Sequence, residues 1–162
     1  MPGPVTPLIA QVIGHLHLQR GRARFRILLR YVPGMGGLVE WEILMTTQVE
    51  AFLDDLYDTD RLSHQLVNQA ILALERGGPA EGRPLVDTVT ASRVANMKEL
   101  RPPSAGRSEV RILFAFDPWR SAVLLVAGDK SGQWKQWYRT AIPQAEQLYE
   151  DYLAEREKEM GR

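Results

Sequence analysis

The sequence has no cysteine and only three histidines among its 162 residues. The missing thiols exclude a disulfide framework, thiolate zinc ligands and a cysteine nucleophile, which fits a reducing, cytoplasmic setting. Long apolar runs are missing as well. The longest, AVLLVA at 122–127, has six residues, whereas a membrane helix needs about 18. We therefore predict no transmembrane helix and no metal centre.

Net charge is also missing, because 20 basic residues balance 20 acidic ones. The balance hides blocks: residues 41–91 hold nine acidic and three basic residues, whereas residues 92–140 hold nine basic and four acidic ones. A basic block inside a neutral chain is a candidate surface for a polyanion such as RNA. The alternative is a solvated strand face that binds nothing, and composition alone favours that alternative.

Residues 1–39 differ from the rest of the chain. They contain five arginines between residues 20 and 30, followed by the glycine-rich stretch PGMGG at 33–37. A secretory signal has its positive charge before its apolar stretch, and here the order is reversed. We expect a poorly ordered basic extension, a weak amphipathic helix over 8–31, or upstream sequence included by an early start codon. The domain itself is expected at residues 40–162.

From residue 40 the hydrophobic pattern predicts regular secondary structure. Residues 41–45 have the composition of a strand, and Thr47 with Glu50 matches a capping box, which predicts a helix capped by Thr47. A second helix, from about residue 60, is ended by the Gly-Gly-Pro stretch at 77–79. These two acidic helices are expected to form a hairpin, followed by a polar loop at 79–92.

Three strand-like segments follow, at residues 94–101, 109–116 and 121–127. The turns between them are short, which predicts an antiparallel meander. From residue 133 the apolar spacing becomes helical, and Pro143 predicts a kink or break at which the longer helix restarts. The expected fold class is α+β: an antiparallel sheet with an N-terminal helical hairpin and a C-terminal helix.

Three stretches, in this order, resemble the RelE/ParE superfamily of bacterial toxins, and most closely its phage-derived HigB-like branch. They are MKELR at 97–101, EVRILFAFDP at 109–118, and the run at 123–153 that contains GDKSGQWKQWYR. The resemblance covers residues 41–153 and implies a RelE-like fold. It also implies a cognate antitoxin, expected to be a helix-turn-helix protein of the HigA kind.

Members of the RelE and HigB type cleave mRNA on the translating ribosome. The resemblance therefore implies a toxin of a type II toxin–antitoxin system, acting as a ribosome-dependent mRNA endonuclease. Such an enzyme uses the RNA 2′-hydroxyl as nucleophile and needs no metal or cofactor. The alternatives are a non-enzymatic, ParE-like inhibitor of DNA gyrase, and a phage-derived interaction protein without cleavage activity.

The resemblance also indicates which residues carry the chemistry. It maps an arginine of the second meander strand onto Arg111 and the basic residue after the last strand onto Lys130. Arg101 lies on the neighbouring strand, and Tyr138 lies near the position of a catalytic aromatic residue in some relatives. These four are the expected catalytic residues. The expected RNA-binding residues are Lys98, Arg107, Lys135 and Arg139.

Each of these residues also has a purely structural interpretation. Arg111 alternates with core-facing neighbours, so it is expected on a solvent-facing side of the sheet, where pairing with Glu99 or Glu109 would account for it. Lys130 has the surroundings of a turn residue. Three aromatic residues have the spacing of a core-facing helix stripe rather than of a base-stacking platform: Trp134, Trp137 and Tyr138.

Overall fold

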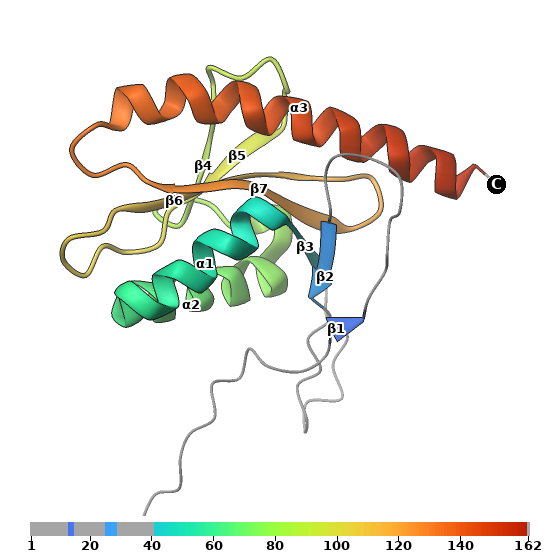
Figure 1. Ribbon diagram of the computed structural model, residues 1–162. Coiled ribbons are helices and arrows are strands. Elements are labelled where there is room, and N and C mark those ends of the chain that lie inside the picture. The colour runs from blue at the N-terminus through green and yellow to red at the C-terminus, as the bar shows by residue number, and fades with distance from the viewer. Residues whose placement is uncertain (1–12, 15–24, 29–40, 162) are drawn as a thin grey trace, which may run out of the picture.

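The protein is described by a computed structural model that covers residues 13–14, 25–28 and 41–161. In chain order the elements are β1 (Ile13–Gly14), β2 (Phe25–Leu28), β3 (Glu42–Thr46), α1 (Thr47–Thr59), α2 (Arg61–Gly77), the short 3-10 helix η1 (Gly78–Ala80), β4 (Val86–Thr88), β5 (Met97–Leu100), β6 (Val110–Phe116), β7 (Ser121–Asp129) and α3 (Trp134–Met160). They form one sheet between two helical layers, with α1 and α2 on one face and α3 on the other (Figure 1).

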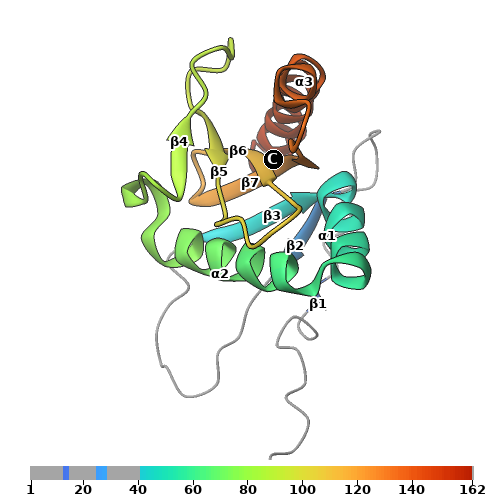
Figure 2. The same ribbon diagram turned by 90° about the vertical axis from the view of Figure 1, so that its left-hand side faces the viewer.

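The strand order is β1-β2-β3-β7-β6-β5-β4, and five of these strands belong to residues 41–161. Strands β5, β6 and β7 form the expected antiparallel meander. The α1–α2 hairpin carries the chain from β3 to the far edge of the sheet, so that β7 returns beside β3 and runs parallel to it. Figure 2 shows the two helical layers on opposite sides of the strands. The α+β prediction is confirmed, with one parallel pair in a mostly antiparallel sheet.

Both faces of the central strands are buried. On one face Ile112 and Phe114 of β6 pack in a cluster with α1 and α2, and on the other Leu113 and Ala115 pack in a cluster with α3. Eight of the nine residues of β7 are buried. This burial explains the near-continuous apolar run of β7, because a strand covered on both faces has no polar side.

The first helix begins one residue earlier than the capping box suggested. Thr46, not Thr47, is the cap: its Oγ1 accepts a hydrogen bond from the Val49 amide at 3.3 Å. The same hydroxyl donates to the Leu125 carbonyl at 2.7 Å. Because β3 leads into α1 without a loop, its last buried residue serves both elements, and Thr47 lies exposed in the first turn.

The end of α2 follows the sequence signal. Gly78 has φ +53°, and a Cβ there would lie 2.2 Å from Nε1 of Trp41, so both the backbone angle and the packing require glycine. The helix start is also as expected, since Asp60 caps it by accepting from the Ser63 amide at 3.2 Å.

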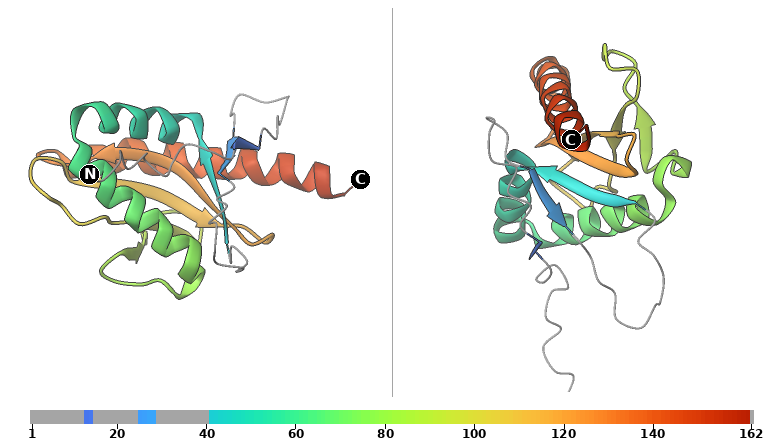
Figure 3. Two further views of the ribbon diagram at one scale, coloured as in Figure 1. Left: turned by 90° about the horizontal axis from the view of Figure 1, so that it is seen from below. Right: turned by 90° about the vertical axis from the view of Figure 1, so that its right-hand side faces the viewer.

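Two local expectations were wrong. The predicted loop at 79–92 contains β4, a three-residue edge strand paired with β5, which is too short to show an alternating pattern. Of the kink or break predicted at Pro143, the break is absent, because helix α3 is continuous through this residue (Figure 3). Pro143 and Arg139 are both exposed, so solvent can satisfy the Arg139 carbonyl that proline leaves without its helical partner.

The N-terminal segment is described only in part. Strand β2 pairs antiparallel with β3, and β1 pairs with β2. The rest of residues 1–40 lies outside the described residues, so a domain beginning at residue 40 stays a prediction. None of the described helices has an apolar stretch long enough to span a membrane.

The cap assignment makes a prediction that two neighbouring variants test. Thr46→Ala should lower the free energy of unfolding by about 1 kcal/mol or more, because it removes the helix cap and a buried hydrogen bond. Thr47→Ala should change it by less than about 0.5 kcal/mol, since that side chain is exposed. Urea denaturation of the two variants measures both. An equal loss in both, or a larger loss at Thr47, would contradict the assignment.

Candidate functional site

Five side chains meet on the α3 side of the sheet, from β5, β6, α3 and the residues directly before β6 and after β7. We call them the Arg111 cluster: Glu99, Glu109, Arg111, Lys130 and Tyr138. Arg111 lies in β6 opposite Gly128 of β7. Its neighbours Val110 and Ile112 pack toward α1 and α2, so alternation turns Arg111 toward α3.

Helix α3 approaches this part of the sheet unusually closely. A Cβ at Gly128 would lie 2.0 Å from Nε1 of Trp137, so the indole occupies the space that any larger residue would need. Because Arg111 pairs with Gly128, the same indole lies next to the arginine. The contact also fixes how far Tyr138, the next residue of the helix, lies from the sheet.

Arg111 is buried, with 7% of its surface exposed, and the expectation of a solvent-facing arginine was wrong. The first turns of α3 cover its side of the sheet. Its Nη2 donates to Oε1 of Glu109 at 3.2 Å and its Nη1 to the Val110 carbonyl at 2.8 Å. Its Nε lies 3.2 Å from Oε1 of Glu99, without the geometry of a hydrogen bond. The arginine thus pairs with both carboxylates that the sequence offered as alternatives.

Lys130 approaches the same carboxylate as Arg111. Its Nζ lies 3.5 Å from Oε1 of Glu109, and its backbone amide donates to the Glu109 carbonyl at 3.0 Å. Two cations therefore converge on one oxygen atom. Glu109 itself lies at the rim, with 39% of its side chain exposed.

The turn that presents Lys130 is ordered by Asp129. Its Oδ1 accepts from the backbone amides of Glu109 at 2.9 Å and Ser131 at 3.0 Å. Partial burial opposes ionisation of this carboxyl, but these hydrogen bonds outweigh it and hold the pKa of Asp129 below its usual value. The turn is therefore held by an ionised carboxylate at neutral pH.

Tyr138 closes the cluster from the helix. Its hydroxyl donates to Oε1 of Glu99. Burial, followed by this hydrogen bond and the negative charge of Glu99, raises the pKa of Tyr138 well above its usual value, and the positive charges of Arg111 and Arg101 only partly oppose the shift. The phenol is therefore neutral at physiological pH, so it can donate a hydrogen bond but cannot serve as a base.

Other residues expected at the site lie around the cluster or away from it. Arg101 lies at its border, where its Nη1 is 3.2 Å from Oδ2 of Asp87. Lys98 lies on the opposite face: it pairs in register with Phe114, which packs toward α1 and α2, and its Nζ donates to Thr88 at 3.0 Å. Lys98 therefore does not share the surroundings of Arg111, because residues 98 and 99 alternate between faces.

The three remaining cations are exposed. Arg107 lies in the connection between β5 and β6, where its charge acts on Asp60 at the α1–α2 junction. Lys135 and Arg139 lie in the first turns of α3, beside the cluster. Among the described residues, no three His, Cys, Asp or Glu side chains are grouped closely enough to hold a metal ion.

One protein family and two named proteins are similar to this chain. The family model described as "Phage derived protein Gp49-like (DUF891)" matches residues 52–150. The chain is similar to a Mycobacterium tuberculosis protein named "Putative toxin HigB2", with 54% identity over 110 residues, which is 68% of this chain and 55% of that protein. It is also similar to "Putative toxin HigB3" of the same organism, with 49% identity over 112 residues, 69% of this chain and 93% of that one.

The chain thus spans about half the length of the first relative and nearly all of the second. No solved structure matches it.

The burial of Arg111 makes a prediction about stability. Arg111→Ala should lower the free energy of unfolding by about 3 kcal/mol, because it leaves the carboxylate of Glu99, which is only 12% exposed, without its cation. Glu109→Ala should cost less than about 1 kcal/mol, because that partner is partly exposed and Arg111 keeps Glu99. Chemical denaturation of both variants tests the difference. A small effect of Arg111→Ala would mean that the arginine is solvated.

Proposed function

This chain belongs to the family of phage-derived Gp49-like proteins, and we propose that it is the toxin of a type II toxin–antitoxin system that cleaves mRNA on the ribosome. Both relatives carry toxin names. The observation that carries the enzymatic part is the convergence of Arg111 and Lys130 on one oxygen of Glu109. Two cations that meet at one anionic atom form a position suited to a phosphate.

In the proposed reaction the RNA 2′-hydroxyl gives its proton to solvent and attacks the adjacent phosphorus. The bond to the 5′-oxygen of the next nucleotide breaks, and that oxygen takes up a proton from solvent. The products are a cyclic 2′,3′-phosphate and a 5′-hydroxyl. The scissile phosphate takes the place of the Glu109 carboxylate, which is exposed enough to turn away. Arg111 and Lys130 then stabilise the additional negative charge of the pentacoordinate transition state.

The rest of the cluster positions these cations. Glu99 holds the guanidinium of Arg111 against the sheet, so its orientation is fixed before the RNA arrives. Tyr138 is neutral at physiological pH and can donate a hydrogen bond toward the departing 5′-oxygen. Arg101, at the border of the cluster, adds positive charge to the approach. These roles need no metal ion or cofactor.

The same proposal includes where the protein acts and what restrains it. A ribosome-dependent nuclease acts in the cytoplasm, on mRNA that is being translated. Its partner is a cognate antitoxin, proposed to be a HigA-like helix-turn-helix protein. Exposed Lys135 and Arg139 beside the cluster, and Arg107 near the helical hairpin, are proposed to contact RNA phosphates. Lys98 lies on the other face and is not part of this path.

The proposal predicts a specific loss of toxicity. Expression of the full chain should arrest growth and produce mRNA cuts with 5′-hydroxyl ends that require translation. Lys130→Ala should lower cleavage by about 10²–10³-fold and leave the protein folded, because its ion pair lies at the rim of the cluster. Arg111→Lys, which keeps a positive charge beside Glu99, should also reduce cleavage strongly. Mapping of mRNA ends and growth curves measure both.

Lys158→Ala is the matched control, since it removes one exposed positive charge from the last turn of α3 and should keep full activity. Arrest with stalled replication and intact mRNA would instead indicate the gyrase-inhibiting alternative. Full toxicity of folded Lys130→Ala would show that the convergent cations do not carry the activity. No arrest at all would favour an interaction protein without cleavage activity.

A further inference from the structure

One tryptophan of α3 is turned toward solvent, although it lies close to the Arg111 cluster. Trp137 is packed over Gly128, whereas Trp134, three residues earlier, is 55% exposed. Exposing an indole forgoes a large part of its hydrophobic stabilisation. Such a residue beside a proposed substrate site is a candidate for contact with the substrate.

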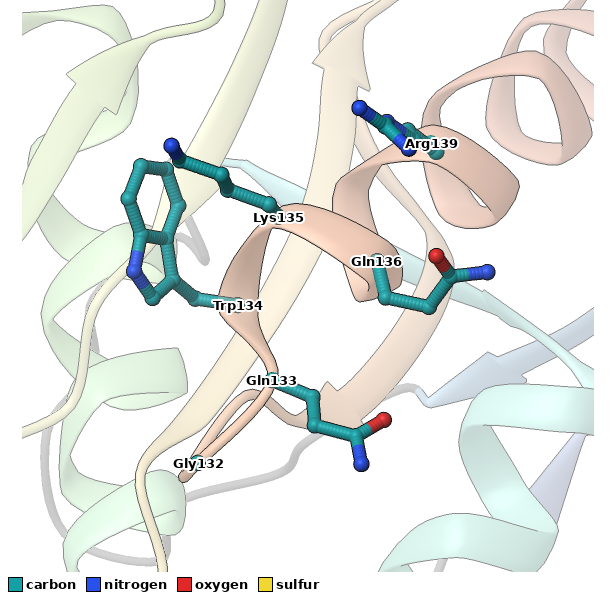
Figure 4. A pocket seen from close by; sticks show the side chains of 6 residues that line it. All are labelled: Gly132, Gln133, Trp134, Lys135, Gln136 and Arg139. Atoms are coloured by element: carbon teal, nitrogen blue, oxygen red, sulfur yellow. The ribbon is translucent and has the colours of Figure 1, made fainter.

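The surroundings of Trp134 indicate which chemistry it suits. It lines an open hollow of about 540 Å³ whose lining contains two cations and two amides but no acidic residue. We call it the Trp134 hollow (Figure 4), and its lining residues are Gly132, Gln133, Trp134, Lys135, Gln136 and Arg139.

Figure 4 shows the side chains of Trp134 and Lys135 lying side by side, with the two glutamines on the other side of the turn. The Nζ of Lys135 is 5.4 Å from the centre of the indole. Neither Lys135 nor Arg139 has an ion-pair partner among the described residues. Their charges are therefore available to an anion, and the glutamine amides can donate or accept hydrogen bonds.

Tyr138 lies between Trp134 and the rest of the Arg111 cluster. The ring centres of Trp134 and Tyr138 are 6.4 Å apart, and Nζ of Lys130 is 5.9 Å from the centre of the Tyr138 ring. An RNA strand whose phosphate is bound by Lys130 and Arg111 therefore brings its adjacent nucleotide close to the indole of Trp134. An aromatic face with flanking cations is the arrangement by which proteins hold an unpaired base and its phosphates.

We propose that the Trp134 hollow binds one unpaired RNA base, stacked on the indole, while Lys135 and Arg139 contact the flanking phosphates. The inference rests on the proposed function, because it places this base beside the phosphate that is cut. It adds a second contact to the substrate that depends on a base rather than on charge.

The test measures binding separately from cleavage. The probe is a short, dye-labelled RNA carrying 2′-O-methyl groups, which cannot be cut because its nucleophile is blocked, and binding to the full chain is followed by fluorescence anisotropy at low salt. Trp134→Ala should weaken binding about 10-fold, since stacking on one aromatic ring contributes on this order. Trp134→Phe, which keeps an aromatic face, should retain most of the affinity. Lys158→Ala should bind like the unchanged protein.

A second probe of the same length lacks its bases but keeps the sugar–phosphate chain. The unchanged protein and Trp134→Ala should bind this probe equally, because only stacking distinguishes them. Lys135→Ala and Arg139→Ala should each reduce the slope of log affinity against log salt by about 0.7 with the complete RNA. Thermal melting confirms that each variant is folded.

Three results would overturn the inference. In the first, Trp134→Ala binds RNA as tightly as the unchanged protein. In the second, it weakens binding of both probes equally, which would assign the indole a role in placing the cations. In the third, it weakens binding of the antitoxin and leaves RNA binding unchanged, which would make the hollow a protein contact. Base-dependent binding without mRNA cuts in cells would instead refute the proposed nuclease activity, while the base-binding role of the Trp134 hollow would be retained.

Discussion

The close contact between Gly128 and Trp137 determines how the candidate site is built. Because β7 has no side chain at this position, α3 can lie directly on the sheet, with the indole where a Cβ would otherwise be. With α3 this close to the sheet, the hydroxyl of Tyr138 reaches Glu99 and the helix covers Arg111. A bulkier residue at Gly128 would lift the helix and separate the phenol, the carboxylate and the guanidinium. The charged cluster therefore depends on an apolar packing contact.

Covering Arg111 has an energetic consequence that accounts for its acidic neighbours. A guanidinium removed from water costs several kcal/mol unless anions compensate it, on the order estimated for buried ions. Glu99 provides this compensation inside the cluster, and Glu109 provides it at the rim. In the proposed reaction the two carboxylates then differ in what they do: the less exposed Glu99 keeps the arginine in place, and the more exposed Glu109 yields its position to phosphate. Burial thus separates a positioning residue from a replaceable one.

Much of the fold could be predicted from the sequence, because local signals and long-range packing agree there. Helix α2 shows this at both ends, since its start near residue 60 and its stop at the Gly-Gly-Pro stretch were both predicted. The predictions fail where a tertiary contact decides. Thr46 is the cap because its hydroxyl also bonds to β7, a contact that no local motif contains. Strand β4 exists because β5 offers an edge, and α3 continues through Pro143 because that side faces solvent.

The candidate site shows the same division. Alternation along β6 correctly indicated the face of Arg111, but its burial depends on α3, which lies more than twenty residues further along the chain. Alternation along β5 applied as strictly would have placed Lys98 on the hairpin face and Glu99 with Arg111. The pairing of Arg111 with both carboxylates was not predictable, since it requires β5, β6 and α3 to be assembled.

The sheet also explains how a chain without net charge can present a cationic surface. The exposed acids Asp54, Asp55 and Asp58 lie on α1, whereas Lys135 and Arg139 lie on α3, across the sheet. Packed layers are separated by about 10 Å, and the Debye length at physiological ionic strength is about 8 Å. Two packed layers therefore separate the acids from the cations by more than the screening distance. An RNA approaching α3 meets the cations with little repulsion from the hairpin. The net charge of the chain is therefore zero, although the acids of the hairpin do not neutralise the cations on α3.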